Sequence, residues 1–247
     1  MRSCSTECSL DDDLHERRIF RPRPMFEHAK LDLNRCGENV PERAREVLFN
    51  PGMWAVLSYR LRRWMRMPHA PKAIRKVLNL ISAILQTCTL VATNIDLPVT
   101  TAIGPGLYIP HTGFIVVSVG SRIGSNCTLT QGVTIGHARG GKKLNCGVPV
   151  IGDRVYVGPS AAIIGSVTIG NDALIGAGAV VIHSVPAGGV VVGNPARVIS
   201  TRGSFDLITY VGMARDKDRL EAIESLRPHG AIETVVPSAL TIPSSHR

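Results

Sequence analysis

The second half of the chain repeats its aliphatic residues with a period of six. The repeat runs in three blocks, and glycine often follows the aliphatic residue directly. The first block contains Ile103, Ile109 and Ile115, and the second contains Ile123, Leu129 and Ile135. The third block contains Ile151, Val157, Ile163, Ile169, Ile175 and Val181. Neither the helical period of 3.6 nor the strand period of two fits this spacing. The pattern predicts a parallel β-helix, in which each hexad builds one face and three faces close a coil.

A second small or apolar residue follows every aliphatic position except Ile135 by four residues. This second column consists of Leu107, Gly113, Val119, Cys127, Val133, Val155, Ala161, Val167, Ala173, Ala179 and Val185. One coil cannot bury such columns by itself, so coils must stack. We expect about five coils of roughly 18 residues in a β-helical domain over residues 96–200.

Two interruptions break the repeat. The step from Ile115 to Ile123 is eight residues, which predicts a two-residue bulge there. A step of sixteen residues separates the second and third blocks, so the segment 137–150 is expected to leave the coil as a loop. Insertions in repeat arrays tend to lie on the functional face.

The first half of the chain has a different pattern. Residues 1–49 carry mixed charge and prolines, which predicts an irregular or weakly helical segment. Over residues 50–95, apolar residues at i, i+3 and i+4 predict two helices, the first after a Pro-Gly pair and the second over about 72–93. For the tail 201–247 we expect one short helix.

The helix expected over 72–93 is apolar enough to raise the question of a membrane span. Its several polar residues make it a poor one. A helix packed on the β-helix or on a neighbouring subunit is favoured. The alternative is a basic amphipathic helix that makes peripheral contact with anionic lipid.

The charge and the cysteines narrow the class of protein further. The net charge is +9, with most basic residues outside the repeat. Such a balance suits nucleic acid, anionic lipid or a phosphate-bearing cofactor, but no nucleic-acid module is visible. The six cysteines form neither metal-ligand spacings nor a disulfide framework. The N-terminus lacks a signal-peptide pattern, so we expect a cytoplasmic protein, with membrane association as an alternative.

Two polar residues within the repeat have no packing explanation. His111 follows the aliphatic position at Ile109, and Asp96 stands near the start of the first coil. Their offset of 15 residues predicts neighbouring positions on successive coils. A carboxylate beside an imidazole fixes its tautomer and raises its basicity, which prepares it as a general base. The alternative is a surface histidine and a capping aspartate.

A zinc site is not expected in the repeat. Its three histidines, His111, His137 and His183, lack the close pairing that such a site needs. We therefore expect no metal cofactor.

The segment 96–200 resembles the hexapeptide-repeat acyltransferases, most closely the serine acetyltransferases. The matching stretches are Ile103–Leu107, His111–Val117, Gln131–Gly136, Ile175–Ala179 and Gly193–Arg197. The resemblance implies a left-handed parallel β-helix, acetyl-CoA as acyl donor, and a homotrimer with active sites between subunits. It also implies that His111 is the catalytic base and that Asp96 orients it.

The same resemblance implies a set of cofactor contacts. Three small residues match places where the family's backbone meets the CoA arm, and a histidine matches a family glycine beside CoA. Basic residues are candidates for the nucleotide phosphates. The expected cofactor-binding residues are Gly136, His137, Lys142, Gly158, Ala177 and Arg197.

Two departures from the serine acetyltransferase pattern bear on the acceptor. The family has an aspartate before the catalytic histidine, where this chain has Pro110. The family closes its long loop with Arg-His, where residues 146–149 read Cys-Gly-Val-Pro. Those charged groups hold the ends of a free amino acid, which need ionic partners when buried. We therefore expect an O-acetyltransferase acting on a hydroxyl of a sugar or polysaccharide precursor. Serine is the alternative acceptor, and a non-catalytic β-helix scaffold is the second alternative.

Overall fold

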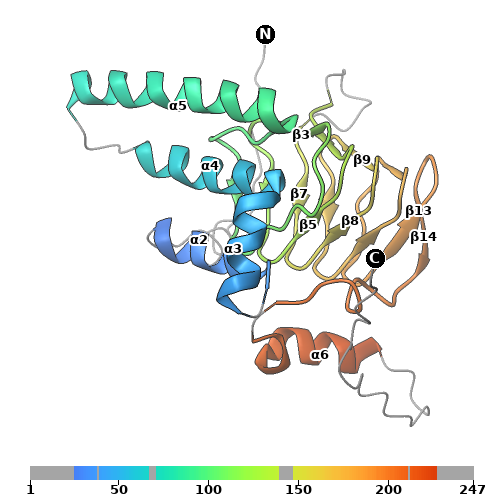
Figure 1. Ribbon diagram of the computed structural model, residues 1–247. Coiled ribbons are helices and arrows are strands. Elements are labelled where there is room, and N and C mark those ends of the chain that lie inside the picture. The colour runs from blue at the N-terminus through green and yellow to red at the C-terminus, as the bar shows by residue number, and fades with distance from the viewer. Residues whose placement is uncertain (1–24, 38, 67–70, 139–146, 211, 227–247) are drawn as a thin grey trace, which may run out of the picture.

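The computed structural model describes residues 25–37, 39–66, 71–138, 147–210 and 212–226. Four N-terminal helices lie at one end of a β-helix, and a short helix lies beside it near the C-terminus (Figure 1). The N-terminal helices are α2 (Met25–Asn34), α3 (Val40–Phe49), α4 (Pro51–Met65) and α5 (Lys72–Thr93). The tail contributes the 3-10 helix η1 (Met213–Arg215) and α6 (Lys217–Leu226).

Three sheets form the faces of the β-helix. Sheet A orders β1 (Ile95–Asp96), β3 (Ile115–Val117), β6 (Thr134–Gly136), β9 (Ala162–Ile164) and β12 (Val180–Val181). Sheet B orders β2 (Ala102–Ile103), β4 (Arg122–Ile123), β7 (Val150–Ile151) and β10 (Thr168–Ile169). Sheet C orders β5 (Thr128–Leu129), β8 (Tyr156–Val157), β11 (Leu174–Ile175), β13 (Val190–Val192) and β14 (Arg197–Ser200). Neighbouring strands pair in parallel, except for the antiparallel pair β13–β14.

The period-six aliphatic residues form the core, as predicted. In sheet B, for example, Ile103 lies opposite Ile123, which lies opposite Ile151. All three side chains are at most 2% exposed. The coils approach closely enough to require glycine at a corner, because a Cβ added to Gly104 would lie 2.7 Å from the carbonyl carbon of Gly124.

The structure corrects the predicted phase of the first block. Val117, not Ile115, lies opposite Ile135 in sheet A. Ile115 lies opposite Ile95 and is buried in the second column, where Gly113 was expected. The predicted phase was wrong because both aliphatic residues, two apart on one strand, face the same side. The other displaced member of that column, Val119, is 62% exposed.

The two-residue bulge therefore lies earlier than predicted, at His111 and Thr112. Before it, Tyr108 bridges to Thr128 of the next coil. After it, the Gly132 N–H donates to the Gly113 carbonyl at 2.7 Å. The extra residues thus stand at the corner where the first coil passes from sheet C to sheet A.

The predicted interruption between the second and third blocks also appears. β6 ends at Gly136, and an antiparallel bridge joins Ala138 to Gly147. The two ends of the expected loop therefore pair with each other as the chain leaves the coil. The middle of this loop, 139–146, lies outside the described residues.

The helices α2 and α4 close the open edge of the first coil. Asp32 of α2, fully buried, pairs with Arg60 of α4 at 2.8 Å. Its Oδ1 also accepts the backbone N–H groups of Gly106 and Leu107, at 2.7 and 3.0 Å. Arg60 in turn donates to the Ile103 carbonyl at 2.7 Å. These contacts satisfy backbone groups that an unpaired sheet edge would leave buried without partners.

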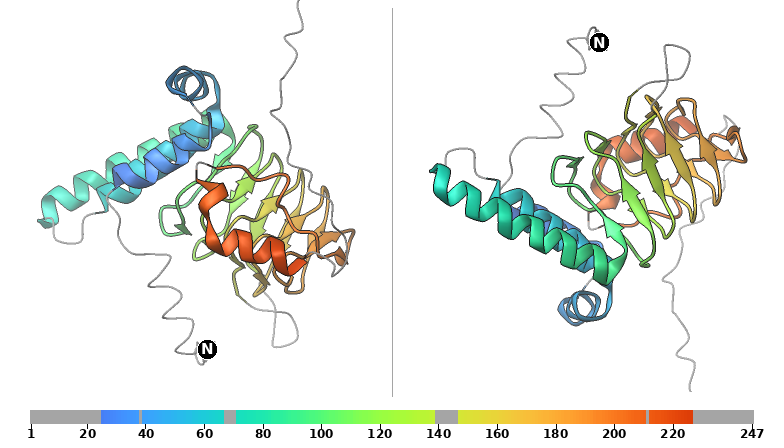
Figure 2. Two further views of the ribbon diagram at one scale, coloured as in Figure 1. Left: turned by 90° about the horizontal axis from the view of Figure 1, so that it is seen from below. Right: turned by 90° about the horizontal axis from the view of Figure 1, so that it is seen from above.

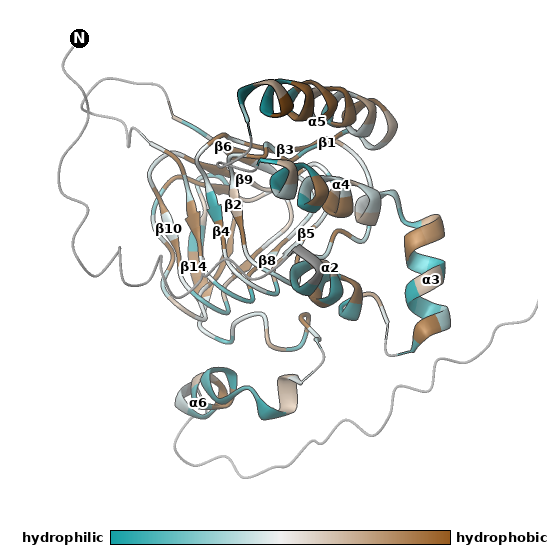
Figure 3. Cartoon of the chain, turned by 90° about the vertical axis from the view of Figure 1, so that its left-hand side faces the viewer, coloured by the Kyte–Doolittle hydropathy of each residue, from teal (hydrophilic) through white to brown (hydrophobic). Residues whose placement is uncertain are grey.

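The helix α5 matches the predicted bounds, but within one chain it does not pack along the β-helix. Its packing on a neighbouring subunit stays a prediction. It runs alongside α4 away from the β-helix, and only its C-terminal end contacts β1 (Figure 2). Ser82 and Thr93 are its buried residues, whereas Leu80 is 63% and Val91 77% exposed. Apolar residues extend along much of its length (Figure 3). Among the described residues, α5 is the helix long and apolar enough to cross a membrane by length and composition alone.

The remaining helices bear on three further predictions. The first helix expected after the Pro-Gly pair is α4, and the short C-terminal helix is α6, so both predictions are confirmed. The segment expected to be irregular or weakly helical instead contains the regular helices α2 and α3. Residues 1–24 of that segment lie outside the described residues.

Candidate active site

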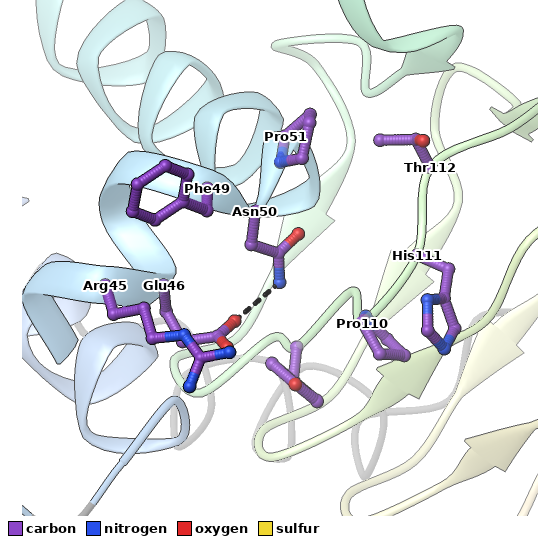
Figure 4. A pocket seen from close by; sticks show the side chains of 9 residues that line it. Arg45, Glu46, Phe49, Asn50, Pro51, Pro110, His111 and Thr112 are labelled. Atoms are coloured by element: carbon purple, nitrogen blue, oxygen red, sulfur yellow. Dashed lines mark hydrogen bonds between the residues drawn. The ribbon is translucent and has the colours of Figure 1, made fainter. Parts of the chain in front are cut away.

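A cavity of about 510 Å³ lies between the α3–α4 junction and the first coil. Side chains from both parts of the chain face one another across it (Figure 4). Its lining residues are Arg45, Glu46, Phe49, Asn50, Pro51, Tyr108, Pro110, His111 and Thr112. The bulge thus places its histidine in the lining of a cavity whose other wall comes from the first half of the chain.

Asn50 fixes the helical wall relative to the bulge. Its side-chain oxygen accepts the Gly52 N–H at 2.8 Å, which caps the N-terminus of α4. Its Nδ2 donates to Glu46 Oε2 at 2.9 Å and to the Ile109 carbonyl at 3.2 Å. One side chain therefore joins α3, α4 and the strand segment that leads to His111.

Gly52 permits the close approach of α4 to the first coil. A Cβ added there would lie 2.2 Å from the carbonyl oxygen of Ile109. Any larger residue would have to displace the first turn of α4 or the chain before His111.

His111 is exposed at the bulge. Within the described part of the chain, its ring makes no hydrogen bond or ion pair. A neutral imidazole with a free ring nitrogen can accept a proton from a hydroxyl placed in the cavity. The structure therefore presents the predicted base where an acceptor can reach it.

Asp96 does not lie next to His111 within the chain. It pairs in register with Val116, which is 116 − 111 = 5 residues beyond the histidine. Its Oδ1 accepts a hydrogen bond from Gln86 Nε2 at 3.0 Å. The expected neighbouring position is wrong because the 15-residue offset does not correspond to one full coil. The orienting role of Asp96 remains a prediction.

The corner between sheets C and A forms a continuous edge along the β-helix. This C–A corner consists of the segments 110–113, 130–132, 158–160 and 176–178. The turn between β13 and β14, residues 193–196, lies next to β12, because the Val180 N–H donates to the Gly193 carbonyl at 2.9 Å. Backbone hydrogen bonds stack one segment on the next. For example, Ser160 N–H donates to Gln131 carbonyl at 2.9 Å, and Gly178 N–H donates to Pro159 carbonyl at 2.8 Å.

Three predicted site residues lie on the C–A corner, and a fourth lies beside it. These are His111, Gly158 and Ala177, with the exposed Arg197 at the start of β14. The close stacking of the coils by itself requires glycine at position 158, because a Cβ there would lie 2.8 Å from the Ala177 nitrogen. The corner is open at Gly178, where an added Cβ would meet no atom within 4 Å.

The other predicted cofactor residues lie elsewhere. Gly136 ends β6, and the exposed His137 follows it, so both lie where the chain leaves sheet A toward sheet B, at the other end of the sheet A strands from the C–A corner. Lys142 lies outside the described residues. Within a single chain, the predicted site residues therefore lie at two corners of the β-helix, one at each end of the sheet A strands.

The helical wall of the cavity was not predicted as part of a site. Arg45, Glu46 and Asn50 lie about 60 residues before the bulge and outside the repeat. The Asn-Pro-Gly sequence at residues 50–52 is an N-cap signature that could have located the start of α4. No spacing rule could have placed that cap against His111.

Comparisons with known proteins identify the class of this fold and site. A family model described as "Bacterial transferase hexapeptide (six repeats)" matches residues 149–183. The chain is thus a hexapeptide-repeat transferase, and its left-handed parallel β-helix is the fold expected of that class. Serine acetyltransferase from Mycobacterium tuberculosis is 34% identical over 195 residues, which cover 74% of this chain and 80% of the relative. The chain belongs to the serine acetyltransferase family.

Solved structures agree with this assignment. Serine acetyltransferase from Neisseria gonorrhoeae in complex with serine has a TM-score of 0.60 and 28% identity, covering 74% of this chain and 72% of that chain. A serine acetyltransferase in complex with CoA has a TM-score of 0.59 and 26% identity, with coverages of 74% and 73%. The chain is therefore an O-acetyltransferase, and acetyl-CoA is its acyl donor.

These comparisons bear on the expected acceptor. The relatives and structures named above are serine acetyltransferases. They support the alternative acceptor, serine, and give no support to the sugar or polysaccharide acceptor that the two sequence departures suggested.

Proposed function

We propose that this chain transfers the acetyl group of acetyl-CoA to the side-chain hydroxyl of serine. The observation that carries the proposal is the position of His111 on a two-residue bulge that lines a cavity. The 34% identity to a serine acetyltransferase, over 80% of that relative, supports serine as the acceptor.

His111 acts as the general base in this reaction. Its free ring nitrogen takes the proton of the serine hydroxyl as the hydroxyl oxygen attacks the thioester carbonyl carbon. The carbon–sulfur bond then breaks, and the protonated ring returns the proton to the departing CoA sulfur. The products are O-acetylserine and CoA, and His111 is restored. Backbone N–H groups near the bulge are candidates for holding the negative oxygen that forms transiently.

The C–A corner fits the extended arm of the donor. The open position at Gly178 and the small side chain of Ala177 leave a strip of accessible backbone. Arg197 stands exposed beside this strip and can pair with a phosphate. Gly158 contributes by allowing the coils to stack closely.

A homotrimer would reunite the divided site. Gly136 and His137 lie at one end of the sheet A strands, and His111 lies at the other end. A second chain is therefore needed to bring them to the same acceptor. Asp96 lies on β1 of that sheet, and it too would reach His111 of another chain. We propose this assembly from the divided residues and from the family resemblance.

An acceptor panel tests the proposal. Purified chain is incubated with acetyl-CoA and either L-serine or free and nucleotide-linked sugars, while release of the CoA thiol is measured. We expect release with L-serine and O-acetylserine by mass spectrometry. Release with a sugar and none with L-serine would refute the proposal and favour the sugar acceptor.

A further inference from the structure

A serine substrate carries two charges that the site must accommodate. Its ammonium and carboxylate groups need ionic or strongly hydrogen-bonding partners wherever they lose water. The stretches that this chain has in place of the family's charged groups contribute none, because they read Pro110 and, at residues 147–149, Gly-Val-Pro. The two partners therefore have to come from residues outside these two stretches.

The helical wall carries one cation and one anion. Arg45 and Glu46 are adjacent on the last turns of α3, and both line the cavity that His111 lines from the other side (Figure 4). Arg45 is exposed, and in the described part of the chain its guanidinium has no hydrogen-bond or ion-pair partner. A planar guanidinium is suited to two parallel hydrogen bonds to a carboxylate.

Glu46 is held more firmly than Arg45. It is half-buried, and its Oε2 accepts the hydrogen bond from Asn50 at 2.9 Å. This contact orients the carboxylate and leaves Oε1 for a second donor. Its negative charge also reaches the neighbouring Tyr108, whose pKa is raised by burial and then by this carboxylate. Glu46 is thus a fixed negative group in a cavity that already contains the proposed base.

We propose, resting on the serine acetyltransferase function proposed above, that Arg45 and Glu46 recognise the two charged ends of serine. Arg45 binds the α-carboxylate, and Glu46 binds the α-ammonium group. The third substituent of the serine α-carbon, the hydroxymethyl group, then points toward His111 on the opposite wall. In this chain the helix α3 supplies charged groups in place of those that the family has at the positions of Pro110 and of residues 147–149.

Paired variants and substrate analogues test this assignment. Arg45→Gln and Glu46→Gln remove one charge each and keep similar shapes. Arg75→Gln on α5 and Glu221→Gln on α6 are matched controls, because both residues are exposed and remote from the cavity lining. Initial rates are measured for L-serine, for L-serinamide, which lacks the carboxylate, and for 3-hydroxypropanoate, which lacks the ammonium group.

Each cavity variant should raise the KM for L-serine by about 10-fold or more, since a hydrogen bond to a charged group contributes about 1.5–3 kcal/mol. The KM for acetyl-CoA should change less than about twofold, because uniform binding of the acceptor alone is lost. The penalty of Arg45→Gln should disappear with L-serinamide, and that of Glu46→Gln with 3-hydroxypropanoate. A general loss of structure would not separate the two analogues in this way.

The outcomes separate this inference from the function on which it rests. If wild-type protein acetylates L-serine and both variants keep its KM, the charge assignment is wrong and the proposed function stands. If the penalties are the same for all three acceptors, Arg45 and Glu46 act only structurally, and the assignment is again wrong. If wild-type protein acetylates no form of serine but acetylates a sugar, both proposals are overturned.

Discussion

The buried carboxylate of Asp32 offers the sharpest test of how the helical region is held on the β-helix. Asp32→Ala removes the acceptor of four hydrogen bonds: two from Arg60, at 2.8 and 3.1 Å, and two from backbone N–H groups, at 2.7 and 3.0 Å. Arg60 is only 3% exposed, so its charge would remain buried without its carboxylate. Breaking a buried ion pair in this way costs about 3–5 kcal/mol.

This loss is large relative to the stability of a typical domain, about 5–15 kcal/mol. The assay is urea unfolding followed by two signals. The only two tryptophans of the chain, Trp54 and Trp64, lie in α4 and report on the helical region, whereas circular dichroism reports on the whole fold. Asp206→Ala, at an exposed aspartate, is the control.

We expect Asp32→Ala to lower the free energy of unfolding by about 3–5 kcal/mol. The tryptophan signal should change at lower urea than the dichroism signal, because the contact joins α4 to the first coil. A loss below about 1 kcal/mol, or one equal to that of Asp206→Ala, would refute the reasoning.

Three further predictions concern the cavity and the core. Gly52→Ala should destabilise the protein by about 1–3 kcal/mol, because the new Cβ would lie 2.2 Å from the Ile109 carbonyl oxygen. An unchanged melting temperature would contradict this close approach. Deleting residues 111–112 restores the six-residue step, so the dichroism spectrum should persist while acetyl transfer is lost; retained transfer would show that the bulge has no catalytic role. Burial raises the pKa of the Cys127 thiol to about 12. After alkylation at pH ~8, peptide mapping should therefore find Cys127 unmodified and the exposed Cys88 modified. Rapid labelling of Cys127 would contradict its place in the core.

The repeat made most of the β-helix predictable from the sequence. A period of six gives each face two inward columns, so the aliphatic residues and the small residues four positions after them also identify the buried positions. The phase failed at Ile115 and Val117 because both are aliphatic and face the same side of one strand. Only the pairing with the next coil distinguishes them, and that pairing moves the bulge onto His111.

The candidate site was less predictable than the fold. His111 could be chosen from its place in the repeat and from the family resemblance. The opposite wall of the cavity could not be predicted in this way, because Glu46 and Asn50 reach the cavity through contacts between distant segments. One such contact is the hydrogen bond from Asn50 to the Ile109 carbonyl at 3.2 Å. The position of Asp96 was missed for a related reason, since its distance from His111 depends on the register of the bulged coil.

The central claim is that one imidazole, presented by a bulge in the first coil, drives acetyl transfer to serine. Its most direct test compares kcat for L-serine in the wild type, His111→Ala and His183→Ala, the last being an exposed histidine of the repeat outside the cavity. We predict that His111→Ala lowers kcat by about 10²–10⁴-fold while CoA still binds, and that His183→Ala stays within about twofold. Equal kcat values in all three proteins would contradict the claim.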